Sequence, residues 1–247
     1  MTQTQVVGFE RLELRFSPKP WRFAQLRRAQ IDAHFARLRA RNPHLWNGRV
    51  LLLHDFALAP DVFHGDYLET DFASFLAWRD WDFPDPSIRN CFGMAALRGA
   101  DGGFLLGVMG EHTANAGKVY FVGGTPDPDD IAAGKVDLHG SVLRELSEET
   151  GLSTRDVAPE GGWHAVFAGV RIAMLKVLDA PVPAAALRAQ ILRFLASQAQ
   201  PELADIRIVN GPGDLDPQMP TFVSAFLAHM WQSPKRGSPP LDHPPRE

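Results

Sequence analysis

RELSEETGL, residues 144–152, places three carboxylates in one short segment. The apolar spacing around it predicts a helix over residues 138–150, and Gly151 follows at the position where a left-handed C-cap is common. Side chains three and four positions apart lie on the same face of a helix, because each residue turns the chain by about 100°. We therefore expect one helix face to carry all three carboxylates, which are Glu145, Glu148 and Glu149.

This clustering of carboxylates indicates a bound cation. Like charges at these spacings destabilise a helix by roughly 0.2–0.5 kcal/mol per pair, and a divalent cation removes the repulsion. Oxygen ligands suit hard cations, and Mg²⁺ completes its coordination with water and phosphate oxygens. The alternative for a glutamate pair alone is an ordinary solvated helix face. On the opposite side of the helix an apolar stripe would fix its orientation, formed by Val142, Leu143 and Leu146.

A glycine corner precedes this helix. The apolar run KVYFVGG, residues 118–124, reads as a strand that ends in Gly123 and Gly124. Glycine lets backbone atoms approach a ligand or an ion closely, because it has no side chain. A strand, a glycine corner and an acidic helix together predict a site for a metal and a phosphate.

The complete segment resembles the core of the Nudix box, R-E-U-x-E-E-x-G-U with U aliphatic, and matches each of its fixed positions. The resemblance implies an α/β fold, the Nudix α/β/α sandwich with a mixed sheet, and hydrolysis of a nucleoside diphosphate linked to another moiety. It also implies that the three glutamates and the backbone carbonyl of Gly124 bind Mg²⁺, with Mn²⁺ as an alternative. Glu145 and Glu148 would be the candidates to activate water, and Arg144 would hold a box carboxylate in place.

One box position departs from the pattern. The family has a glutamate eight positions before the arginine, usually as a structural partner of that arginine, and this chain has Val136 there. The neighbouring residue, Asp137, is the candidate for a shorter carboxylate in that role. A Nudix-fold protein that binds nucleotides without cleaving them is therefore the main alternative function. The presence of all three box carboxylates favours the enzyme.

The order of segments predicts two folded parts and a tail. We expect a smaller α+β module over residues 1–88, a Nudix hydrolase domain over residues 89–232, and a proline-rich disordered tail over residues 233–247. In the first part, residues 5–16 indicate a strand and residues 21–41 a helix.

The first module suggests a substrate. NPHLWNGRVLLLH, residues 42–54, and GDYLETDFASFLAW, residues 65–78, resemble the region ahead of the box in the animal UDP-glucose pyrophosphatase branch of the superfamily. That resemblance implies that a UDP-sugar is cleaved to UMP and a sugar 1-phosphate. ADP-ribose and coenzyme A diphosphatases are the alternatives within the superfamily, and a metal-dependent phosphatase or nuclease of unrelated fold is the alternative outside it.

Substrate contacts and a general base are expected in loops beside the sheet. His112, Asn115 and Lys118 lie in one such loop, just ahead of the glycine corner, and are the candidate substrate-binding residues. The candidates for a base outside the box are Glu111, Asp214 and Asp216.

Composition limits the class of partner. The net charge of -4 gives no general attraction to polyanions, and the arginines of residues 22–41 alternate with apolar residues as on a solvated helix face. We expect a small-molecule partner, with neither a nucleic-acid polymer nor a membrane, and a homodimer by analogy only. The single cysteine, Cys91, and the lack of a signal-like apolar segment predict a cytoplasmic location.

Overall fold

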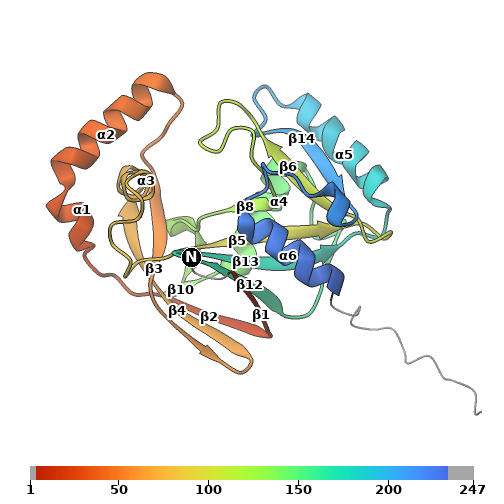
Figure 1. Cartoon of the computed structure of the whole chain (residues 1–247), viewed down its shortest axis with the longest axis horizontal. Helices are drawn as coiled ribbons and strands as arrows, with labels where there is room; N and C mark the ends of the chain where they lie inside the picture. The colour runs from red at the N-terminus through yellow and green to blue at the C-terminus, as the bar shows by residue number, and fades with distance from the viewer. Residues whose placement is uncertain (1–3, 233–247) are drawn as a thin grey trace, which may run out of the picture.

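The larger of two β-sheets runs through the centre of residues 4–232, the part of the chain that this computed structural model describes (Figure 1). Strands β5 and β13 run parallel along their whole length, and the other neighbours are antiparallel, so the sheet is mixed. Its main path is β1 (Gln5–Phe9), β12 (Trp163–Ala168), β13 (Arg171–Asp179), β5 (Asn90–Arg98), β6 (Phe104–Met109) and β14 (Leu203–Val209). Three short strands pair beside this path, β7 (Val119–Tyr120), β8 (Val122–Gly124) and β11 (Ala158–Pro159).

Helices cover both faces of this sheet. Alternate residues of a strand point to opposite faces, so β5 contributes to two separate apolar cores. Cys91, Ala95 and Leu97 pack in the core that includes α4 (Leu138–Thr150) and α5 (Ala184–Ser197). Phe92, Met94 and Ala96 pack with α6 (Thr221–Gln232). The expected α/β/α sandwich with a mixed sheet is confirmed.

The smaller sheet lies beside this sandwich. Its order is β3 (Arg49–Ala59), β4 (Val62–Asp71), β2 (Arg11–Phe16), β10 (Lys135–Val136) and β9 (Ile131–Ala132). Its helices stand together at the left of Figure 1, and they are α1 (Arg22–Leu26), α2 (Arg28–Arg41) and α3 (Phe72–Asp80). The helix expected over residues 21–41 is therefore two helices, which meet at Arg27.

The two sheets exchange strands. The segment expected as one strand over residues 5–16 divides at Glu10, so that β1 joins the larger sheet and β2 the smaller one. In return, the hairpin β9–β10 lies in the sequence just ahead of α4 but pairs with β2. The division after residue 88 remains a prediction, and neither sheet is built from one side of it alone. The expected disordered tail, residues 233–247, lies outside the described residues.

Helix α4 is fixed closely against the larger sheet. Asp137 caps its N-terminus by accepting a hydrogen bond from the backbone N–H of Gly140, and Gly151 ends it with φ of 71°. Val142 and Leu146 are fully buried. Gly93 permits this packing, because a Cβ atom there would lie 2.6 Å from the Val142 side chain. Within residues 4–232, no helix is long and apolar enough to cross a membrane.

Candidate functional site

Glu145 and Glu149 form a carboxyl pair between α4 and the glycine corner. The two side chains share a hydrogen bond, and the backbone N–H of Gly123 donates to Glu149. A Cβ atom built on Gly124 would lie 3.4 Å from a carboxylate oxygen of Glu145, so the glycine leaves this carboxylate close to the strand. The corner is tight, since Gly123 has φ of 148° and a Cβ there would lie 2.2 Å from the carbonyl oxygen of Gly93.

Burial and neighbouring charge keep this pair partly protonated. Burial raises the pKa of Glu149 to about 9, and the charges of Glu202 and Glu145 contribute to this rise. Burial also raises the pKa of Glu145, although Arg144 opposes this shift. Two adjacent carboxyl groups in such a place hold a proton between them, because both cannot ionise without a compensating cation. A divalent cation can replace that proton, so the donors fit the oxygen-rich site that Mg²⁺ needs.

Glu202 extends the carboxyl pair from a different part of the chain. It lies directly before β14, and its charge acts on Glu149, on Glu145 and on Tyr120. Burial raises the pKa of the Tyr120 hydroxyl, so this phenol stays neutral, and it accepts a hydrogen bond from Asn115 at 3.1 Å. No sequence motif marks Glu202, because sheet pairing alone places β14 in this neighbourhood.

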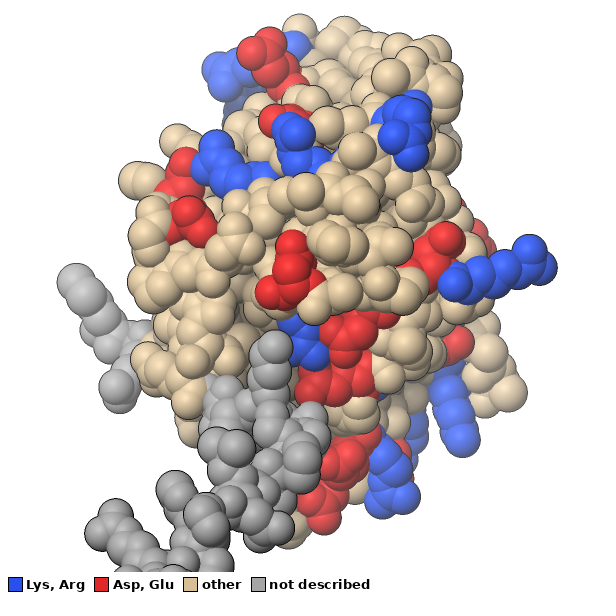
Figure 2. Space-filling view, turned by 90° about the vertical axis from the view of Figure 1, so that its right-hand side faces the viewer, with Lys and Arg blue, Asp and Glu red and all other residues tan. Residues whose placement is uncertain are grey.

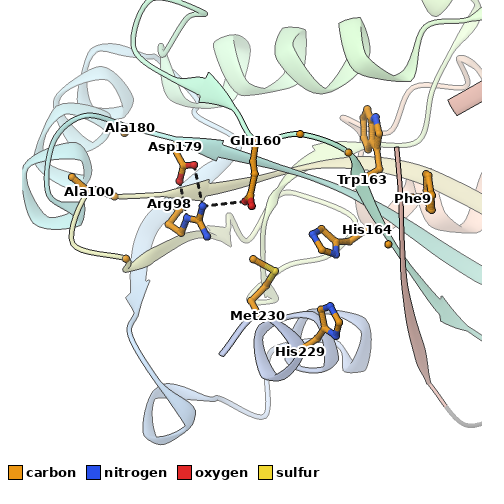
Figure 3. Close-up of a pocket in the computed structure, with 15 residues that line it drawn as sticks. Phe9, Arg98, Ala100, Glu160, Trp163, His164, Asp179, Ala180, His229 and Met230 are labelled. Carbon is orange, nitrogen blue, oxygen red and sulfur yellow. Dashed lines mark hydrogen bonds and ion pairs between the residues drawn. The ribbon is translucent and has the colours of Figure 1, made fainter. Parts of the chain in front are cut away.

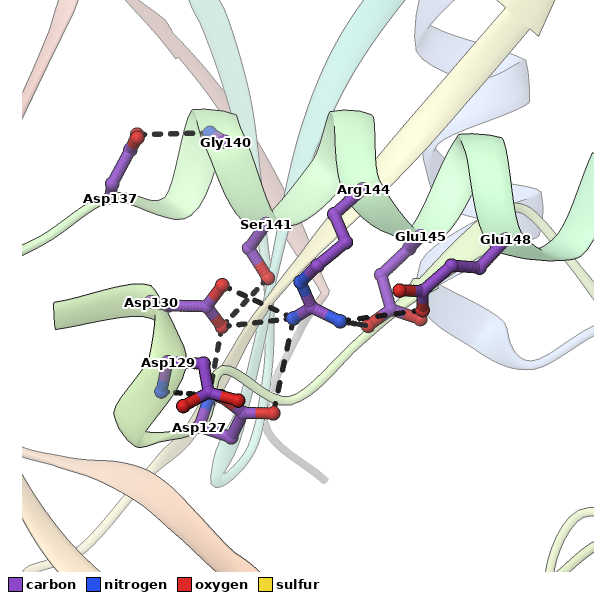
Figure 4. Close-up of polar contacts among 9 residues, drawn as sticks. All are labelled: Asp127, Asp129, Asp130, Asp137, Gly140, Ser141, Arg144, Glu145 and Glu148. Carbon is purple, nitrogen blue, oxygen red and sulfur yellow. Dashed lines mark hydrogen bonds and ion pairs between the residues drawn. The ribbon is translucent and has the colours of Figure 1, made fainter. Parts of the chain in front are cut away.

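Arg144 joins the acidic helix to the preceding turn (Figure 4). Its guanidinium lies 3.0 Å from Glu145 and 3.4 Å from Glu148, and it donates to Asp130 at 3.1 and 3.3 Å. Burial alone would lower the pKa of Arg144, but the hydrogen bond and charge of Asp130 raise it strongly. Arg144 is therefore a permanent cation that holds carboxylates on both sides.

The prediction that Asp137 pairs with Arg144 was wrong. Asp137 caps α4 through Gly140, and Figure 4 shows it at the opposite end of the helix from Glu148. Val136 is buried in the apolar core. Asp130, from the 3-10 turn Pro128–Asp130, pairs with the arginine because the short hairpin after it folds back beside α4.

Glu148 differs from the other two glutamates. Its side chain is 60% exposed, whereas that of Glu145 is 20% exposed. The sequence predicted that one helix face carries all three glutamates, but Glu149 is buried whereas Glu148 is exposed. As the side chains stand within residues 4–232, no three His, Cys, Asp or Glu residues are arranged to hold a metal. Glu148 instead lies 3.4 Å from Arg144.

The candidate substrate residues occupy one loop but face different partners. Asn115 reaches the site through Tyr120. The carbonyl of His112 accepts a hydrogen bond from Asn42, which follows α2, at 2.7 Å. Lys118 lies 3.4 Å from Gln218 and is exposed. Their roles remain predictions.

The candidate bases of the later loop are engaged elsewhere. Asp214 accepts hydrogen bonds from the backbone N–H groups of Asn210 and Gly211, and Asp216 pairs with Arg207. These contacts stabilise the loop between β14 and α6. The charge of Glu202 instead acts on both glutamates of the pair, and the charge of Asp130 acts on Glu145.

A separate cavity of about 680 Å³ opens between β1, β12 and the end of α6 (Figure 3). Its walls include Trp163, His164 and His229. The Arg98 guanidinium in it is held by Asp179 at 2.7 Å and by Glu160 at 3.0 Å. None of the box glutamates lines it, so this cavity is not the site on α4.

Figure 2 shows another view of the surface, where acidic side chains gather below the centre and basic ones are scattered.

Comparisons with known proteins find solved structures that resemble part of this chain, but they find no sequence relatives. No family model matches the chain, and no curated protein matches it. A solved Nudix hydrolase from M. smegmatis, RenU, is 16% identical with a TM-score of 0.36, over 57% of this chain and 81% of that one. The MutT protein from Methanosarcina mazei is 21% identical with a TM-score of 0.39, over 57% of this chain and 91% of that one. A point mutant of the Bacillus subtilis pyrophosphohydrolase BsRppH is 17% identical with a TM-score of 0.31, over 54% and 70%.

Proposed function

We propose that this chain is a Nudix-type diphosphatase, which uses Mg²⁺ to hydrolyse the diphosphate bond of a nucleoside diphosphate linked to another moiety. The observation that carries the proposal is the buried carboxyl pair of Glu145 and Glu149 beside Gly124. A buried acidic pair costs stability unless a bound cation compensates it, which is typical of a functional site.

The residues divide into metal ligands and a base. Glu145, Glu148, Glu149 and the carbonyl of Gly124 would hold the ion. A bound Mg²⁺ would neutralise phosphate oxygens, lower the pKa of water and stabilise the leaving phosphate. Glu148 is the first candidate to accept the proton of the attacking water, because its exposed carboxylate meets solvent. Glu202 is the second candidate, because its charge acts on the same carboxyl pair.

A UDP-sugar is the substrate that we favour. The segment of residues 42–54 carries part of the sequence resemblance to UDP-glucose pyrophosphatases, and it contacts the chain on both sides of the glycine corner. Asn42 contacts the carbonyl of His112, and the backbone N–H of Leu51 donates to Pro126 at 2.7 Å, two residues after Gly124. Trp46, between these contacts, is 80% exposed and offers a surface on which a uracil ring can stack.

Product analysis tests both levels of the proposal. The chain would be incubated with UDP-glucose, ADP-ribose, NADH, coenzyme A, diadenosine polyphosphates and nucleoside triphosphates, with Mg²⁺ or with chelator, and the products separated by chromatography. We expect UMP and glucose 1-phosphate from UDP-glucose with Mg²⁺ only. Hydrolysis of a different compound from this panel would support the diphosphatase activity and reject a UDP-sugar as the substrate. No turnover by folded protein would favour a nucleotide-binding protein.

A further inference from the structure

Asp130 is a buried carboxylate that the proposed reaction does not use. Its side chain is only 4% exposed. It accepts hydrogen bonds from Arg144 at 3.1 and 3.3 Å, from the Ser141 hydroxyl at 3.0 Å and from the backbone N–H of Asp127 at 3.0 Å. These donors come from α4 and from the turn before it. The carboxylate therefore ties the two elements together at one point.

Arg144 links Asp130 to the carboxylates on α4. The guanidinium that binds Asp130 through Nη2 contacts Glu145 and Glu148 through Nη1. A guanidinium is a planar group with fixed donor directions, so a partner on one edge restricts where the other edge points. Asp130 thus sets the direction from which Arg144 meets both glutamates.

The smaller sheet fixes Asp130 in turn. On one side of it along the chain, the carbonyl of Pro126 accepts a hydrogen bond from Leu51 in β3. On the other side, the carbonyl of Gly134 accepts from Phe16 at 2.9 Å, and Lys135 pairs with Arg15 in β2. Both anchors belong to the sheet formed mainly by the first 71 residues. The segment that carries Asp130 is held by that sheet rather than by α4 alone.

We propose that Asp130 is a positioning residue, through which the smaller sheet sets the arrangement of the metal-binding carboxylates by way of Arg144. It supplies the anionic partner that Val136 cannot supply. The inference rests on the proposed function for its consequence, since the carboxylates are assigned to a metal there. Its structural part, the hold of Asp130 on Arg144, stands on the contacts alone.

Asp130→Asn tests the inference, with Asp129→Asn as the matched control. Asp129 is adjacent and less buried, and Figure 4 shows no dashed line from its carboxylate to Arg144. The readout is Mn²⁺ affinity by calorimetry on the full chain, together with kcat and KM for the substrate found. We expect Asp130→Asn to weaken Mn²⁺ binding by about 10-fold or more, the size of effect typical of partners of metal ligands. Asp129→Asn should leave the affinity unchanged.

Arg144→Gln and the double variant separate positioning from folding. If Asp130 acts through Arg144, the double variant should bind Mn²⁺ no more weakly than the weaker single variant. Additive losses would overturn the proposal. Should Asp130→Asn not fold, Arg144→Gln must show the loss of affinity by itself, and an unchanged affinity there would overturn the proposal as well.

Hydrogen exchange without metal distinguishes this inference from the proposed function. In Asp130→Asn, amides of α4 and of residues 127–136 should exchange faster than in Asp129→Asn. Equal exchange would overturn the positioning role even if the enzyme is active. Faster exchange in Asp130→Asn, together with a wild-type chain that binds no Mn²⁺, would instead reject the proposed metal site and leave the hold on Arg144 intact.

Discussion

The carboxyl groups of Glu145 and Glu149 stand one helical turn apart and share a hydrogen bond in a largely buried place. Because the folded protein raises the pKa of Glu149 to about 9, the protonated form contributes stability that is lost as the pH rises toward that value. We expect the metal-free chain to lose stability as the pH rises from about 5 to about 9. Urea unfolding with chelator measures the slope.

Glu149→Gln is the control for that pH dependence. The amide cannot ionise, so the variant should show a shallower loss between the same pH values. Saturating Mg²⁺ should also remove most of the wild-type loss, because the cation compensates the ionised pair. Parallel curves for wild type and variant would contradict the assigned protonation.

Glu148→Gln should remove activity without changing the fold. Its side chain is 60% exposed, so the amide costs little stability, whereas the site loses a proposed metal ligand and the first candidate base. We expect kcat/KM to fall by at least about 100-fold. Thermal unfolding should stay close to wild type, and Ser147→Ala, exposed on the same helix, is the matched control. Full turnover by Glu148→Gln would reject this helix as the metal site.

Glu202→Gln and Glu111→Gln compare two carboxylates outside the box. The charge of Glu202 acts on Glu149, so its replacement should lower kcat and leave unfolding unchanged. Glu111→Gln should retain wild-type kinetics. If only Glu111→Gln lowers kcat, the general base would be Glu111, in the loop before the glycine corner, which the sequence also offered as a candidate.

Gly123→Ala and Gly124→Ala should have opposite consequences. A Cβ at Gly123 would lie 2.2 Å from a backbone carbonyl oxygen, and the φ of 148° is unfavourable for alanine. We expect a loss of more than about 1 kcal/mol in the free energy of unfolding. A Cβ at Gly124 meets Glu145 at ordinary contact distance, so Gly124→Ala should keep its stability while weakening Mn²⁺ binding. Equal melting of the two variants would contradict this difference.

Helix α4 and its buried apolar side could be predicted from the sequence because their determinants are local. Glutamate spacing, the apolar stripe and Gly151 all act within about four turns of one helix. Asp130 could not be predicted as the partner of Arg144, because that pair depends on a hairpin whose strands join another sheet. Glu202 was missed for the same physical reason, since a non-local strand pairing brings it to the site. The single strand expected over residues 5–16 shows the same limit, because alternation does not say which sheet a residue joins.

The exchanged strands predict that residues 89–247 will not fold alone into an active enzyme. Strand β1 pairs with β12 from Gln5 to Phe9, and Phe9 is buried in the core that includes α4. Without β2, the hairpin before α4 also loses the pairing that holds Asp130. We expect the fragment to show little cooperative unfolding in urea and no Mn²⁺ binding. Addition of residues 1–88 as a separate fragment should restore part of both. Cooperative unfolding of residues 89–247 with wild-type Mn²⁺ affinity would instead show that the first segment is an independent module, and that α4 is positioned without the smaller sheet.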